Sequence, residues 1–146
     1  MKYQQLKIIS LSIWWGAFTF YAGVVIPVGM RVLGSHTEMG FITQQVTIYV
    51  NVFSLIVFLF CAYCLHNEAF TTNILIEQII VISIIGFQLL LFLLHAYLTD
   101  LLNFEKHTIV NPDNFYLLHR IYLIIETLIW LTISILLVRE ISKVKN

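Results

Sequence analysis

The sequence predicts an all-α membrane protein, an antiparallel bundle of four transmembrane helices with its N- and C-termini in the cytoplasm. Of its 146 residues, 60% are hydrophobic and 11% are charged, whereas soluble domains carry about 25% charged residues. The mean hydropathy is +0.90. A chain with so few polar side chains cannot cover itself with a polar surface, so its solvent is expected to be lipid.

Four apolar windows divide the chain. One crossing takes about 20 residues at helical rise to span about 30 Å of hydrocarbon. Each window has this length, and none alternates apolar with polar residues as a membrane strand does. The sequence therefore predicts a single four-helix transmembrane domain over residues 1–146, with helices at about 8–32, 36–65, 74–98 and 112–139.

The first apolar window is expected to stay as a helix and not to act as a cleaved signal. It contains Trp14, Trp15 and Pro27 and has no clear small-residue cleavage site. The tryptophans are expected to lie in the interfacial belt or against lipid. Small residues at three- or four-residue spacing predict a face on which another helix approaches closely; these residues are Ser12, Gly16, Thr19 and Gly23.

The second helix begins with a capping signature and carries a polar face. Ser35 followed by Glu38 predicts a capping box, in which each side chain bonds the backbone amide of the other. Polar residues then recur at steps of three and four, which places them on one side of a helix that should face protein. These residues are Gln44, Thr47, Asn51 and Ser54.

The third and fourth helices each carry one polar face. Asn111 and Pro112 predict an N-cap and a first-turn proline for the fourth helix. The third helix presents Glu77, Gln88 and His95 on one side, and the fourth presents His119, Tyr122, Glu126 and Trp130.

Depth links these two faces. His95 and His119 lie near the same end of antiparallel helices, and seven residues further in, about 10 Å at helical rise, are Gln88 and Glu126. A carboxylate deep in the bilayer is costly, so Glu126 should be neutral, hydrogen-bonded or beside a cavity, with Gln88 as its expected partner. The predicted intramembrane polar seam consists of Asn51, Gln88, Tyr122 and Glu126.

His95 and His119 allow two interpretations. Two histidines from different helices at one depth could hold a b-type haem or a metal ion. The other interpretation, which is the commoner one for interfacial histidines, is that they are amphipathic residues near the headgroups. The sequence does not identify a metal. Cys61 and Cys64 have redox-motif spacing but lie in an apolar helix, which favours a packing role.

Orientation is expected to follow the positive charges that flank the helices. Five Lys and Arg residues lie near the two chain ends, namely Lys2, Lys7, Arg139, Lys143 and Lys145. Three lie on the opposite side, namely Arg31, Lys106 and Arg120. The bias predicts cytoplasmic termini.

Several short motifs resemble a known family. The chain reads Trp15-Gly16 in its first helix, then Gly23 to Pro27, and Asn114 to His119 at the start of its last helix. This pattern is similar to a family of small bacterial four-helix membrane proteins of unassigned function, akin to a vertebrate transmembrane protein associated with drug tolerance. The matching positions are Trp15, Gly16, Pro27 and His119, and the third helix does not match. The resemblance implies a bundle with His119 in a fixed environment and no enzyme activity.

Three functional hypotheses follow. The first is a non-enzymatic protein of the lipid bilayer, either a homo-oligomer or a small subunit of a larger membrane complex. The second is a haem-binding or quinone-linked electron-transfer protein that uses His95 and His119. The third is a carrier for a small solute or proton that uses Glu126. The 8 basic residues balance 8 acidic ones and form no basic cluster, so nucleic-acid binding is not expected.

Overall fold

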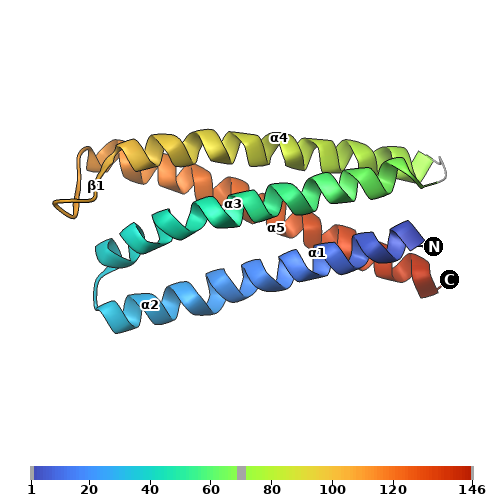
Figure 1. Ribbon diagram of the computed structural model, residues 1–146, viewed down its shortest axis with the longest axis horizontal. Coiled ribbons are helices and arrows are strands. Elements are labelled where there is room, and N and C mark those ends of the chain that lie inside the picture. The colour runs from blue at the N-terminus through green and yellow to red at the C-terminus, as the bar shows by residue number, and fades with distance from the viewer. Residues whose placement is uncertain (1, 69–71, 146) are drawn as a thin grey trace.

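Four long helical rods joined by short connections make up the computed structural model, which describes residues 2–68 and 72–145 (Figure 1). The first rod comprises α1 (Lys2–Phe20), the π-helical turn η1 (Tyr21–Val25) and α2 (Ile26–Leu33). The other rods are α3 (His36–His66), α4 (Thr72–Asp100) and α5 (Pro112–Lys145). Strands β1 (Leu102–Asn103) and β2 (Thr108–Ile109) form a small antiparallel hairpin between α4 and α5.

The helix ends follow the local rules read from the sequence, with one exception. Gly34 ends α2 in the left-handed region, at φ 64°, and Ser35 then caps α3 by accepting from the Glu38 amide at 3.2 Å. Asn111 caps α5 in the same way. Only half of the predicted capping box forms, because the Glu38 carboxylate instead pairs with His107 Nδ1 of the hairpin turn at 2.9 Å.

The rods pack as a ring. Helices α1 and α4 each pack against both α3 and α5, while α2 packs against α3 and makes no substantial contact with α5. Both chain ends lie at one end of the bundle, and the hairpin lies at the other, where the first rod diverges from the rest (Figure 1). Among the described residues, four helices are long and apolar enough to cross a membrane. The predicted all-α four-helix fold is confirmed, and the chain is a multi-pass membrane protein, while the cytoplasmic location of the termini stays a prediction.

Burial separates a core from a lipid-facing exterior. Leu11, Phe58, Cys61 and Ile133 are at most 1% exposed and meet at the centre of the ring. The outward faces carry large apolar side chains, as lipid requires. Representative exposed residues are Ile13, Phe20, Ile56, Ile82, Leu93, Ile124 and Ile135.

The predicted small-residue packing face of the first helix is wrong for three of its four residues, while Thr19 Oγ1 accepts from Trp130 Nε1 of α5 at 2.9 Å. Ser12, Gly16 and Gly23 are exposed, and a Cβ added at either glycine would meet no other described atom within 4 Å. The larger side chains of α1 make the contacts instead.

The predicted interfacial position of Trp14 and Trp15 is also wrong. Trp14 is 2% exposed and donates its indole N–H to Ser54 Oγ at 2.7 Å. Trp15 donates to Ser134 Oγ at 2.7 Å, so the two rings tie α1 to α3 and to α5. An indole N–H in hydrocarbon needs an acceptor, and the serine hydroxyls of the neighbouring helices supply it.

Candidate functional site

The predicted polar seam forms one connected group at the centre of the bundle. Asn51 Oδ1, on α3, accepts from Gln88 Nε2 of α4 at 3.0 Å and lies 2.9 Å from the Tyr122 hydroxyl of α5. The same hydroxyl lies 3.2 Å from Glu126 Oε1. Asn51, Gln88 and Tyr122 are 0%, 2% and 5% exposed. We call these four residues the central network.

The immediate partner of Glu126 differs from the one expected. The sequence predicts Gln88, but Gln88 bonds Asn51 and reaches Glu126 only through Asn51 and Tyr122. Tyr122 precedes Glu126 by one turn on the same helix, so its hydroxyl reaches the carboxyl group without crossing the bundle. The depth match between α4 and α5 therefore holds, while the direct pairing does not.

Proton counting gives the central network two arrangements. A tyrosine hydroxyl carries one proton, so Tyr122 can donate to Asn51 or to Glu126 but not to both. When Tyr122 donates to Asn51, the short contact with Glu126 requires a protonated carboxyl that donates to the tyrosine oxygen. When Glu126 is ionised, Tyr122 donates to the carboxylate and Asn51 loses that donor. The contact between α3 and α5 thus depends on the proton of Glu126.

Two buried polar atoms beside this network have no hydrogen-bond partner among the described residues. They are Asn51 Nδ2 and the hydroxyl of Tyr21. The Thr47 hydroxyl is close to Tyr21 but not in hydrogen-bonding geometry, and the Glu126 carboxyl is near enough to interact electrostatically. An unsatisfied buried polar group costs about 1–3 kcal/mol, which a purely structural core would avoid. No sequence signal marks Tyr21, because its position depends on the π turn.

His95 and Gln44 clasp α4 to α3. The Gln44 carbonyl can only accept, so His95 Nε2 carries the proton of the 2.8 Å bond between them. In return, Gln44 Nε2 donates to the His95 carbonyl at 3.1 Å and to Thr99 Oγ1 at 2.8 Å. Interhelical contacts are therefore confirmed for three residues of the polar face predicted for the second helix, Gln44, Asn51 and Ser54, and for all three of the third, Glu77, Gln88 and His95.

The two histidines lie in different surroundings. His95 Nε2 donates to the Gln44 carbonyl, which leaves Nδ1 as the ring nitrogen with a lone pair. His119 stacks on Phe115, with centroids 5.8 Å apart and 6° between the ring planes, and lines a cavity that does not include His95. The hypothesis of a b-type haem between His95 and His119 has no support in this geometry.

A cavity of about 400 Å³ opens where the first rod diverges from α5. Its walls come from α2, α3, the hairpin and α5, and include Ile26, Met30, Gln44, Leu102, His119 and Leu123. The next turn of α5 towards the bundle centre carries Tyr122 and Glu126. We call this space the hairpin-side cavity.

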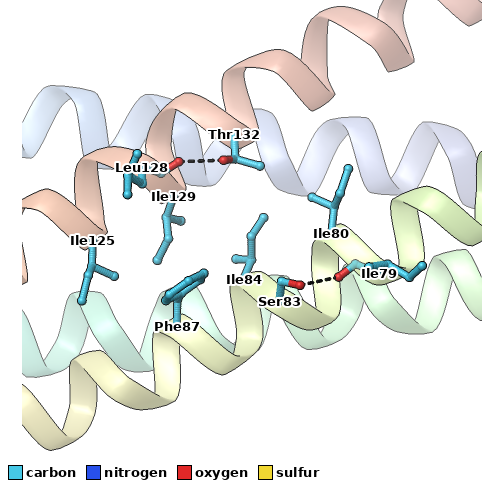
Figure 2. Close-up of a pocket in the computed structure, with 9 residues that line it drawn as sticks. All are labelled: Ile79, Ile80, Ser83, Ile84, Phe87, Ile125, Leu128, Ile129 and Thr132. Atoms are coloured by element: carbon cyan, nitrogen blue, oxygen red, sulfur yellow. Dashed lines mark hydrogen bonds between the residues drawn. The ribbon is translucent and has the colours of Figure 1, made fainter.

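A second hollow, of about 250 Å³, lies on the lipid-facing seam between α4 and α5. Figure 2 shows its side chains reaching towards one another from the two helices. Its polar residues, Ser83 and Thr132, bond the carbonyls of their own helices at Ile79 and Leu128. Because both hydroxyls are bonded within their own helices, the groove offers a ligand apolar contacts but few polar ones.

An ionic cluster closes the end of the bundle where the chain termini lie. Lys7 Nζ is 2.8 Å from Glu140, 3.2 Å from Glu77 and 3.2 Å from Glu68. Lys143 also pairs with Glu77 and Glu140. Lys7, Glu77 and Glu140 are each 2% exposed. Three carboxylates and two ammonium groups give the cluster a formal charge of −1.

The sequence correctly predicts Lys7 near the end of the bundle where the chain termini lie, but the burial of its side chain was missed. Lys7, Leu11 and Trp14 are all buried, at steps of four and three, so Lys7 lies on the core face of α1. That spacing was visible in the sequence. Glu77 was correctly placed on the same face as Gln88 and His95, since all three are buried.

An apolar layer separates the central network from the ionic cluster. On α5 the buried residues between Glu126 and Glu140 are Ile129, Ile133 and the pair Leu136 and Leu137. Val57 and Phe58 of α3 belong to the same buried group. On the hairpin side, Glu126 is therefore one turn away from residues that line a cavity. On the side of the chain termini, the apolar layer separates it from the ionic cluster.

Comparisons with protein-family models, with curated proteins and with solved structures give no match to this chain.

Proposed function

We propose that this chain is a proton-linked carrier of a small solute, with Glu126 as the group that carries the proton. The observation that supports this most is the position of Glu126. It belongs to a buried hydrogen-bond network that accommodates two protonation states, with the hairpin-side cavity on one side and an apolar layer on the other. Intramembrane acidic residues in such positions are typical of proton relays.

The hydrogen bonds suggest how the proton would act. With Glu126 protonated, Tyr122 donates to Asn51 and links α5 to α3. After the proton leaves, Tyr122 turns to the carboxylate, and Asn51 keeps only the bond from Gln88. Loss of one interhelical bond, worth about 1 kcal/mol, shifts the balance between closed and separated helices. Protonation of Glu126 would thereby be coupled to movement of α5 relative to α3.

Proton movement into liposomes tests this proposal. Purified protein is reconstituted into liposomes that contain a pH-sensitive dye. A potassium gradient with valinomycin sets the membrane potential that drives protons inward. Wild-type protein should acidify the lumen faster than protein-free liposomes, and Glu126→Gln should reduce the rate to the protein-free level. Glu105→Gln, an exposed carboxylate of the hairpin turn, is the matched control and should behave as wild type.

Two results would contradict the proposal. One is wild-type flux no faster than that of empty liposomes. The other is unchanged flux in Glu126→Gln, provided that its helical circular dichroism and elution volume show a folded protein. Tyr122→Phe should give an intermediate rate, because it removes the switching hydroxyl and leaves the carboxyl group in place.

Cellular placement and assembly are further proposals. We propose a bacterial inner membrane with cytoplasmic termini, on the support of the five positive charges near the chain ends against three near the hairpin. Lys7 and Lys143 are ion-paired in the cluster, which reduces the free charge behind this bias. A membrane-impermeant thiol reagent applied to intact cells should label a cysteine placed at Lys106. Labelling only after lysis would place Lys106 on the cytoplasmic side and would contradict the proposed orientation.

Kinship and partners are proposed on narrower grounds. Membership of the four-helix family of unassigned function is supported by Trp15, Gly16, Pro27 and His119 alone. A homo-oligomer or a subunit of a larger membrane complex is supported by the small size of the bundle, since four helices bury little of their own perimeter. The mass of the protein–detergent complex measures this directly.

A further inference from the structure

The walls of the hairpin-side cavity suit an apolar body. Ile26 and Met30 project from α2, Phe115 and Leu123 from α5, and Leu102 from β1. The volume of about 400 Å³ lies within the usual range for small-molecule sites, about 300–1,000 Å³. The cavity exists because α2 follows α3 and leaves α5, so it is a property of the helix arrangement.

His119 is a half-buried polar residue of the cavity with hydrogen-bonding capacity to spare, whereas the lining residues His36, Thr37 and Tyr116 are exposed. The Thr43 hydroxyl bonds the Gly40 carbonyl at 3.0 Å, and the Gln44 amide nitrogen is used by α4. The His119 ring is held flat against Phe115, and over the described part of the chain its nitrogens have no hydrogen-bond partner. A fixed imidazole with free nitrogens can donate to, or accept from, one group of a ligand.

The charges around the cavity favour acids over bases. Its described lining contains no Asp, Glu, Lys or Arg. The Glu38 carboxylate is paired with His107. A bound cation would therefore meet no counter-charge in the lining, whereas a carboxylic acid or phenol could form a hydrogen bond with the His119 imidazole.

We propose that the hairpin-side cavity binds a small amphipathic molecule that is neutral or weakly acidic, with its apolar body among α2, β1 and α5 and its polar group at His119. This inference rests on the proposed function, because it names the class of solute that the carrier would take up next to Glu126. Binding itself is measurable without transport.

Three naphthalene probes of equal size test the class. The protein in lipid nanodiscs is heated with 2-naphthoic acid, 2-naphthalenemethanol or 2-naphthylmethylamine, and the unfolding midpoint is followed by circular dichroism. A ligand that binds the folded state raises the midpoint. The acid and the alcohol should raise it by several degrees, and the amine should raise it by much less.

Variants assign the binding to this cavity. Gly40 lines it, and a Cβ added there meets no described atom within 4 Å, so Gly40→Leu is expected to occupy part of the cavity. This variant should lose the shift, whereas the control Gly16→Leu, on the exposed face of α1, should keep it. His119→Phe preserves the stacked ring and removes the nitrogens, and should weaken binding of the acid by about tenfold.

The outcomes separate this inference from the carrier proposal. Equal stabilisation by the amine would overturn the ligand class, and an unchanged shift in Gly40→Leu would overturn the cavity as the binding site. Neither result would affect the Glu126-dependent proton flux. Loss of the shift in Gly16→Leu as well would show that the effect of Gly40→Leu is not specific to the cavity and would also overturn the site. If the wild-type protein shows the expected midpoint shifts but no proton flux, the binding site stands and the carrier proposal is contradicted.

Discussion

Replacing Lys7 by methionine removes the cation that three carboxylates share. Lys7 Nζ lies 2.8 Å from Glu140 and 3.2 Å from both Glu77 and Glu68, and the residue is 2% exposed. Breaking a buried ion pair from one side costs about 3–5 kcal/mol, because a charge is left poorly hydrated. Lys143 still faces Glu77 and Glu140, and the Glu68 side chain is 16% exposed. We therefore expect the lower end, about 3 kcal/mol.

Unfolding in mixed micelles with increasing dodecyl sulfate measures this loss, with tryptophan fluorescence as the signal. Lys2→Met is the matched control, since Lys2 is exposed on the same helix, and it should stay within about 0.5 kcal/mol of wild type. Adding Glu140→Gln to Lys7→Met should recover part of the stability, because it restores the formal charge of the cluster to −1. If Lys7→Met were as stable as Lys2→Met, the buried cluster would not hold the termini end together.

Two further substitutions probe other contacts. Asn51→Leu should destabilise the bundle by about 2 kcal/mol in the same unfolding assay, because the Gln88 amide and the Tyr122 hydroxyl lose their shared acceptor; a loss no larger than that of Val52→Leu on the exposed side of α3 would contradict the central network. Gly34→Ala should cost about 1 kcal/mol, because φ 64° is strained for a residue with a Cβ; unchanged stability would show that the turn adapts.

Periodicity and punctuation predicted most of the fold. The four apolar windows, the serine and asparagine caps and the seven-residue steps each depend on residues close together in the chain. Helical geometry converts such spacing into faces, so the burial of Asn51, Gln88 and Tyr122 could be foreseen. The matching depth of Gln88 and Glu126 followed from counting residues from a common end.

Features that depend on which helices become neighbours were not predictable. The partners of Trp14 and Trp15 are serines 40 and 119 residues away, and no local pattern specifies them. The direct bond of Tyr122 to Glu126 depends on rotamers. The β1–β2 hairpin was missed because its strands are two residues long, which is too short to show an alternation of apolar and polar residues. The π turn likewise left no signal.

The π turn at Tyr21–Val25 divides the first rod into two parts with different attachments. The N-terminal part is anchored by Lys7 and the two indoles, while the C-terminal part carries Ile26 and Met30 into the cavity wall. A π turn holds one more residue than an α turn, and such turns are frequent at functional sites. Conversion of the π turn to an α turn would rotate the C-terminal part about the helix axis, and with it the cavity wall, while the N-terminal part keeps its contacts.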